Sequence, residues 1–120
     1  MATQARGGGA LLSFETGSVE VSRAFVAAAS AKRGGMFKQT VSFGSVSSLV
    51  EIPAEMSHAS IPASDREGNL PDDLVRVSVG VEDVNDLVVG LTAALAAAQA
   101  APKIASPACS TKTALVAAPR

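Results

Sequence analysis

The chain has few of the residues that mark disulfide-rich, metal-binding or aromatic-rich proteins. Its 120 residues include one cysteine, one histidine, and no tryptophan or tyrosine. The single cysteine, Cys109, excludes an intrachain disulfide framework and fits a reducing compartment. The histidine, His58, has no cysteine or second histidine near it in the sequence, so we predict a structural role in a loop and no metal site.

Charge and long hydrophobic runs are also scarce. A net charge of -1 gives no long-range field that would attract nucleic acid or an anionic membrane surface. The longest apolar run, Leu87 to Ala98, is mostly alanine, is interrupted by Thr92 and falls short of the ~20 apolar residues that span a bilayer. Ala10 to Leu12 is too short for a signal peptide. We therefore expect a soluble chain with neither nucleic acid nor membrane as a partner.

Length and composition indicate one domain flanked by irregular segments. A chain of this length can bury roughly 65% of its unfolded surface, which is enough for one core. The run Gly7-Gly8-Gly9 predicts a flexible lead-in over residues 1–9, followed by a folded domain over residues 10–98. Residues 99–120 are rich in alanine, proline and serine, and we predict a disordered, low-complexity tail.

The domain is predicted to begin with a strand and a helix. Residues 10–15 alternate in hydrophobicity from Leu12 onward, as a strand does. Ser18 can serve as the N-cap of a helix that continues through Ser30. Residues 32–35, Lys-Arg-Gly-Gly, are predicted to provide basic side chains in the last turn and then to end the helix. The apolar positions of this helix are Val21, Phe25, Ala28 and Ala29.

Two short strands and a long loop are predicted next. The strands cover residues 38–43 and 48–52, and a glycine-serine segment bends the chain between them at Gly44. Pro53 ends the second strand because it lacks a backbone donor. Residues 53–73 contain prolines and small polar residues, and such long loops in compact domains are often functional or covered by a neighbour.

The last predicted elements are a strand over residues 74–80 and a helix from about Glu82. In the strand, Val75, Val77 and Val79 share one face, whereas Arg76 and Ser78 share the other. The helix is expected to carry one apolar stripe, formed by Val84, Leu87, Val88, Leu91 and Leu95. The acidic residues Glu82, Asp83 and Asp86 lie near its positive N-terminus. The order of elements predicts an α+β fold with a small, mainly antiparallel sheet and helices on one face.

The sequence between Thr40 and Leu87 carries a specific family pattern. It contains TVSFGSVSSLVEIPAEMSHASIP and then DLVRVSVGVEDVNDL, and a related lead-in, QARGGGALLSFETGS, begins at Gln4. In this order and spacing, the segments resemble the C-terminal domain of pyridoxal-phosphate enzymes of cysteine and methionine metabolism. The motifs are most similar to those of cystathionine β-lyases of the plant and fungal type, and the resemblance extends to about Ala97. It implies the C-terminal small domain of a fold type I PLP-dependent transferase.

The resemblance also implies a site for the α-carboxylate of the substrate. Arg76 stands where the LxRxSxG strand of the family places an arginine that grips this carboxylate. Ser42 matches the first serine of the family's SxG turn, which is implied to assist. A guanidinium suits this task because its planar fork matches a carboxylate with two parallel hydrogen bonds. Judged from the residues alone, Arg76 is a solvated charge on the polar face of a strand, and Ser42 is a turn residue.

We identify no catalytic, cofactor-binding or metal-binding residue in the chain. The resemblance implies pyridoxal 5'-phosphate in a full-length parent, attached to a lysine in a Ser-x-Thr-Lys segment upstream of this domain. None of the lysines occupies an equivalent place: Lys32, Lys38, Lys103 and Lys112. Ser110-Thr111-Lys112 imitates the segment by chance, within the predicted tail. We therefore expect a fragment of an enzyme that by itself neither binds the cofactor nor catalyses a reaction.

Three interpretations of function remain open. In the first, the parent is a lyase of the transsulfuration and methionine biosynthesis pathways that cleaves cystathionine to homocysteine, pyruvate and ammonia. The sequence SFGSVSS from Ser42 favours it, because bacterial and γ-synthase members more often have SxGGxES there. In the second, the same domain belongs to a cystathionine γ-synthase or γ-lyase. In the third, the chain is a stand-alone domain that binds amino-acid carboxylates or joins an oligomer without catalysis.

The partners and the compartment follow from the resemblance as well. It implies a small amino-acid substrate and a homotetrameric parent. Plant-type members are plastid proteins, but the chain carries no recognisable address, so plastid and cytoplasm both remain open.

Overall fold

Strands and helices alternate along the chain in the computed structural model, which describes residues 7–32, 34–66 and 70–100. Three of its elements are helices and four are strands, and they follow one another in the order β1, α1, β2, β3, α2, β4, α3. Their bounds are Leu11–Glu15 for β1, Val19–Ala29 for α1, Lys38–Gln39 for β2, Leu49–Glu51 for β3, Ala63–Arg66 for α2, Leu74–Ser78 for β4 and Val84–Ala100 for α3.

The four strands form one sheet in the order β1-β4-β3-β2. Strand β4 pairs antiparallel with both β1 and β3, whereas β2 pairs parallel with β3. The prediction of an antiparallel sheet is therefore right for the centre and wrong for the β2 edge, and the sheet is mixed. The parallel pair arises because residues 40–48 carry the chain from the end of β2 back to the start of β3.

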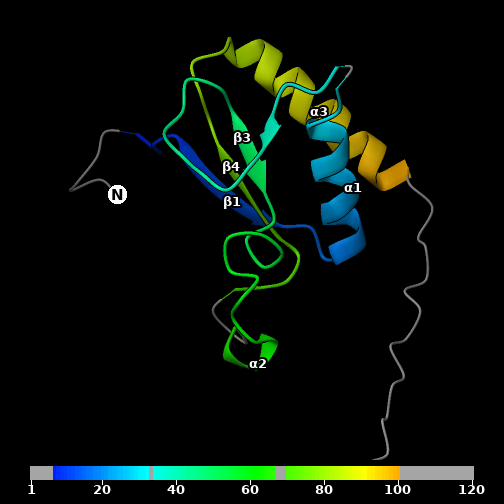
Figure 1. Ribbon diagram of the computed structural model, residues 1–120. Helices are drawn as coiled ribbons and strands as arrows, with labels where there is room; N and C mark the ends of the chain where they lie inside the picture. Colours follow the sequence, from blue (N-terminus) through cyan, green and yellow to red (C-terminus); the bar gives the residue numbers. More distant parts are fainter. Residues whose placement is uncertain (1–6, 33, 67–69, 101–120) are drawn as a thin grey trace, which may run out of the picture.

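Helices α1 and α3 form a layer beside the sheet, as Figure 1 shows. Helix α1 contacts β3 and β4, and α3 packs extensively against α1. The two long helices thus lie on one side of the sheet, as the sequence predicts, and the second covers the first. The other face of the sheet carries Glu51 and Arg76.

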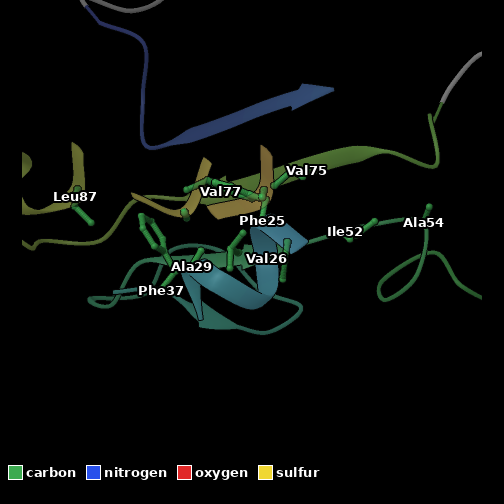
Figure 2. Close-up of a cluster of buried hydrophobic side chains, with 12 residues drawn as sticks. Phe25, Val26, Ala29, Phe37, Ile52, Ala54, Val75, Val77 and Leu87 are labelled. Atoms are coloured by element: carbon green, nitrogen blue, oxygen red, sulfur yellow. The ribbon is translucent and has the colours of Figure 1, made fainter. Parts of the chain in front are cut away.

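The core lies between α1 and the central strands (Figure 2). Phe25 and Val26 of α1 are buried against Val75 and Val77 of β4, and both valines have no exposed surface. The ring of Phe14 on β1 meets that of Phe25 edge to face, with centroids 5.5 Å apart. The valine face predicted for β4 is therefore the core face, because alternate residues of a strand point to the same side.

The ends of α1 differ from the prediction in their side-chain contacts. The helix begins directly after Ser18, but the hydroxyl of Ser18 makes no capping hydrogen bond to the helix. Instead, it donates to Glu20 Oε2 at 2.6 Å. The helix ends at Ala29, so Lys32 lies beyond it, and the predicted basic last turn is wrong. The segment before β4 is fixed to α1 by the buried Ser22, whose hydroxyl donates to the carbonyl oxygen of Asp73 at 2.6 Å.

Helix α3 buries Leu87 of the predicted stripe and packs Leu91 against the core, but the predicted valines are exposed. Its buried side chains are Leu87, Ala94 and Ala98, whereas Val84 and Val88 are more than half exposed. The reason is that α3 packs on α1 and the following loop through small residues, which let helices approach closely. Gly90, for example, lies so near Met36 that an added Cβ would be 3.3 Å from the Met36 sulfur. The larger valines are consequently turned outward.

Two further predictions are corrected by the backbone. The strand predicted over residues 38–43 is reduced to Lys38–Gln39, because the chain turns away from the sheet afterwards. The loop predicted over residues 53–73 contains the short helix α2. Helix α3 continues to Ala100, whereas most of the predicted tail, with Cys109 and Ser110 to Lys112, lies outside the described residues, as does most of the predicted lead-in.

None of the helices among the described residues has the length and hydrophobicity needed to cross a bilayer.

Truncation of one core valine tests this packing. Val77→Ala removes two buried methyl groups and should lower the free energy of unfolding by about 2 kcal/mol. The matched change Val81→Ala, at a valine that is 80% exposed, should alter it by less than about 0.5 kcal/mol. Urea unfolding followed by circular dichroism measures both, and equal effects of the two changes would contradict the assigned core.

Candidate functional site

The candidate site is built on the register of strands β3 and β4. Glu51 lies directly opposite Arg76 in this antiparallel pair, so both side chains extend from the same face of the sheet. The Arg76 Nη2 atom forms an ion pair with Glu51 Oε1. The side chain of Glu51 is only 1% exposed and that of Arg76 is 18% exposed. Arg76 therefore points away from the core valines, as predicted, but it is not a solvated charge.

The SxG turn, formed by Ser42, Phe43 and Gly44, lies beside Arg76. The Arg76 Cζ atom is 5.3 Å from the centroid of the Phe43 ring, which is within cation–π distance. The backbone N–H of Gly44 donates to the hydroxyl of Ser78 at 3.2 Å, and Ser78 follows Arg76 by two residues on β4. Gly44 has φ of 75°, a left-handed conformation that glycine adopts without strain. The structure thus brings together the two motifs that the sequence singled out.

Ser42 itself is exposed and does not touch Arg76 through a hydrogen bond. Its backbone N–H donates to the carbonyl oxygen of Thr40 at 3.2 Å. Its hydroxyl has no hydrogen bond to another described residue. The predicted pair is therefore adjacent through Phe43 and Gly44, and the Ser42 hydroxyl is open to a ligand.

A second set of hydrogen bonds fixes the far end of the segment that carries the turn. Glu82, just before α3, accepts from the backbone N–H of Ser48 at 2.7 Å and from its hydroxyl at 2.8 Å. The buried Ser48 hydroxyl in turn accepts from the backbone N–H of Gly80 at 2.9 Å. An added Cβ at Gly80 would lie 2.7 Å from the carbonyl carbon of Ser47, so only glycine permits this approach. The turn is consequently held at both ends by the β4–α3 region.

The hydrogen bonds from Ser48 also change the acidity of Glu82. The backbone N–H of Ser48 is the largest cause of a lowered pKa of the Glu82 carboxyl, because it stabilises the carboxylate form. The backbone N–H of Glu82 and the Ser48 hydroxyl act in the same direction. The sequence places Glu82 near a helix N-terminus, but its role in holding the turn could not be predicted from that position.

Glu51, Phe43 and the contact of Glu82 with Ser48 are the parts of the site that the sequence analysis missed. A signal for Glu51 was present, because it is the single acidic residue among the otherwise apolar residues 49–52. A buried charge is expected to have a partner of opposite sign. No comparable signal marked Phe43, whose side chain is 62% exposed.

The histidine predicted to serve in a loop lies next to this network. The backbone N–H of His58 donates to the carbonyl oxygen of Pro53 at 2.8 Å, within a series of turns. Its Nδ1 atom is 2.9 Å from the hydroxyl of Ser57, which also donates to Glu51 Oε1 at 3.1 Å. The described residues contain no group of acidic, histidine or cysteine side chains that could hold a metal ion.

The described residues do not form a site for pyridoxal phosphate. Three of the four phenylalanine rings pack in or against the core, and the fourth, Phe43, stacks on Arg76. Helix α3 begins with acidic side chains, and Asp83 Oδ1 there accepts from the backbone N–H of Asn85 at 2.8 Å, which disfavours a phosphate. The Nζ atom of Lys38 is bound to the hydroxyl of Ser47 at 3.1 Å. No chemical step that uses this cofactor can therefore be assigned to these residues.

The acidity of Glu82 predicts how stability depends on pH. The pKa of the Glu82 carboxyl is lowered in the folded state. Its contribution to the free energy of unfolding is therefore fully present above the ordinary pKa of 4.5, and it is lost as pH falls through the lower pKa of the folded state. We expect Glu82→Gln to be less stable than the original chain near neutral pH and to lose less stability on acidification. Urea unfolding at several values between about pH 6 and pH 3 measures this.

Glu15→Gln is the control for this measurement, because Glu15 is exposed and its side chain makes no hydrogen bond to another described residue. If the original chain and Glu82→Gln lose stability in parallel as pH falls, Glu82 does not hold the turn.

Comparison with known proteins places the chain in a family. The family model for Cys/Met metabolism PLP-dependent enzymes matches residues 1–96. The chloroplastic cystathionine beta-lyase of Mimosa pudica is 50% identical over 94 residues, which cover 78% of this chain and 20% of the relative. The chain therefore spans about a fifth of the length of the curated relative that it matches.

Solved structures of related enzymes share the fold. Cystathionine gamma-lyase from Lactobacillus plantarum, complexed with L-serine, has a TM-score of 0.71 and 35% identity, covering 82% of this chain and 25% of that one. Cystathionine gamma synthase from Xanthomonas oryzae pv. oryzae, in complex with cystathionine, has a TM-score of 0.70 and 38% identity, with the same coverage. The predicted resemblance is thus confirmed, and the chain belongs to the family of PLP-dependent enzymes of cysteine and methionine metabolism.

Proposed function

We propose that the chain is the C-terminal, substrate-carboxylate-binding part of a PLP-dependent carbon–sulfur lyase, the parent of which cleaves cystathionine to homocysteine, pyruvate and ammonia. The observation that carries this proposal is the arrangement of Arg76, whose guanidinium lies between Glu51 and the ring of Phe43, beside the SxG turn. The 50% identity to a cystathionine beta-lyase over most of the chain supports the β-lyase activity.

In this function, Arg76 binds the α-carboxylate of the amino-acid substrate. A guanidinium with a fixed plane can offer two parallel N–H groups to the two carboxylate oxygens. The exposed hydroxyl of Ser42 adds a donor on the same side of the turn. Such binding contributes to catalysis through orientation, because it sets which bond of the substrate is presented for cleavage.

The proposal assigns residues 10–98 to the carboxylate-binding domain and the cofactor to the rest of a longer parent. The chain covers 20% of the Mimosa pudica enzyme, which supports this division. A homotetrameric parent is part of the same proposal. By itself the chain is then inactive.

Two alternatives are retained because specific observations favour them. A different reaction of the parent is the first alternative, since a cystathionine gamma-lyase and a cystathionine gamma synthase superpose on the chain with TM-scores of 0.71 and 0.70. All of these activities act on an amino-acid carboxylate, so the Arg76 site fits each of them. The second alternative is a stand-alone, non-catalytic domain that binds amino-acid carboxylates or joins an oligomer, and the core cluster formed by the described residues favours it.

The role of Arg76 can be tested in a chimeric enzyme. Residues 4–97 of this chain replace the matching segment of the Mimosa pudica beta-lyase, and cystathionine cleavage is assayed. Arg76→Ala should lower kcat/KM roughly ten- to a hundred-fold, because a hydrogen bond to a charged group contributes about 1.5–3 kcal/mol. Arg76→Lys should not restore the original value, because a lysine lacks the fork.

Arg23→Ala is the matched control, since Arg23 pairs with Glu55 on the surface and is 60% exposed. It should leave kcat/KM nearly unchanged. Removal of Arg76 without loss of activity would exclude it from the substrate site.

Sequencing and product analysis separate a β-lyase, a γ-lyase and a non-catalytic domain. The transcript upstream of the Met1 codon should continue an open reading frame that includes a Ser-x-Thr-Lys segment. The complete enzyme should release pyruvate and homocysteine from cystathionine. Release of cysteine and 2-oxobutyrate instead would indicate a γ-lyase, and a stop codon directly before Met1 would favour the non-catalytic domain.

A further inference from the structure

The buried carboxylate opposite Arg76 has no role in the function proposed above. Glu51 is among the least exposed side chains of the described residues, although acidic residues are rarely buried without a reason. Burial of a carboxylate is costly unless hydrogen bonds and an opposite charge compensate for it. Its position is set by the sheet, because the β3–β4 register places it directly opposite Arg76.

The contacts of Glu51 are concentrated on one of its two oxygens. Oε1 accepts from Arg76 Nη2 and, at 3.1 Å, from the hydroxyl of Ser57. Oε2 is buried and has no hydrogen-bond partner. A carboxylate held only to stabilise the fold would be expected to satisfy both oxygens, so this arrangement is costly for folding. The ion pair with Glu51 Oε1 restricts the direction of the Arg76 side chain.

The contacts of Arg76 leave most of its donors unused. Among the described residues, Glu51 is its one ion-pair partner, and the contact uses Nη2 only. The ring of Phe43, whose centroid is 5.3 Å from the Cζ atom, is a second neighbour of the guanidinium. The ion pair and the ring contact together limit the movement of the side chain, and the other N–H groups make no contact that uses them within the described residues. A bidentate carboxylate ligand requires this kind of fixed fork.

We propose that Glu51 is the positioning residue for Arg76, which orients the guanidinium before the substrate carboxylate arrives, and that Ser57 holds Glu51 in place. This inference rests on the proposed function, because it assumes that Arg76 binds the substrate. Glu51 itself does not touch the substrate. Preorganisation of this kind reduces the loss of side-chain freedom on binding.

A competing role for Glu51 would change KM in the opposite direction. If Glu51 competed with the substrate for Arg76, its removal would free the guanidinium and strengthen substrate binding. If Glu51 positions Arg76, its removal lets the guanidinium rotate and weakens binding. The direction of the change in KM therefore decides between the two.

The kinetic test uses the chimeric enzyme with Glu51→Gln, which keeps the shape of the side chain and removes its charge. We expect KM for cystathionine to rise roughly tenfold with a smaller change in kcat, because the interaction binds ground state and transition state alike. Ser57→Ala, at an exposed residue that tolerates truncation, should raise KM by about two- to fivefold. Glu55→Gln, which breaks the surface pair with Arg23, is the matched control and should leave KM unchanged.

A second measurement reports orientation directly in the full 120-residue chain. In nitrogen-15 NMR spectra, hindered rotation of the Arg76 guanidinium should give separately resolved Nη–H signals, assigned by their loss in Arg76→Lys. Glu51→Gln should broaden or average these signals, whereas Glu55→Gln should leave them unchanged. If Glu51→Gln fails to fold, Ser57→Ala supplies both measurements.

The outcomes separate this inference from the proposed function. An impaired Arg76→Ala with unaffected Glu51→Gln and Ser57→Ala overturns the positioning role and leaves the carboxylate-binding function intact. A lower KM in Glu51→Gln overturns the positioning role in favour of competition. An Arg76→Ala enzyme with normal kinetics overturns both.

Discussion

The antiparallel pairing of β3 with β4 is the constraint on which the rest of the structure depends. In its register, Val50 and Val77 meet on the core side while Glu51 and Arg76 meet on the other. A shift of one residue would turn the charged pair into the core and the valines out of it, because side chains alternate along a strand. Formation of the core and formation of the candidate site are therefore one event, since the same pairing produces both.

The turn beside Arg76 depends on the same strand. Gly44 is bound to Ser78 at the end of β4, and Ser48 is bound to Glu82 shortly after it. Both anchors use backbone N–H groups of the turn segment, and the second also uses the buried hydroxyl of Ser48, which donates to Glu82 and accepts from the backbone N–H of Gly80. An exposed and locally irregular segment is in this way attached to β4, the strand that carries Arg76.

The sequence predicted the elements whose pattern is decided locally. The alternation of apolar and polar residues in β4 identified its core face, and the spacing of apolar residues around Phe25 identified α1. Both elements contribute side chains directly to the core between α1 and the sheet. Helix α3 was less predictable. It packs on another helix through Ala94 and Ala98, so its buried stripe depends on residue size more than on hydrophobicity. A prediction from hydrophobicity therefore wrongly places the large valines in that stripe. The parallel β2 edge depends on the path of residues 40–48, which no local signal encodes.

The candidate site was predictable to the extent that it lies in motifs. Arg76 and Ser42 were found because each stands in a recognisable pattern, and the structure places both in one region. Glu51 and Glu82 were missed because their partners, Arg76 and Ser48, are distant in the sequence and meet only after the sheet has formed. Long-range charge pairing of this kind depends on register, which a single sequence specifies only through the complete fold.

Strand β1 lies at one edge of the sheet. It pairs with β4 on one side only, and within the described residues its other edge has no strand beside it, while Leu11 and Leu12 are 46% and 41% exposed. Unpaired backbone donors and acceptors on a strand with apolar side chains form a template onto which another extended segment can add. A segment that added to this edge would extend the sheet that carries Arg76, so a contact made there would be continuous, through β1 and β4, with the candidate site.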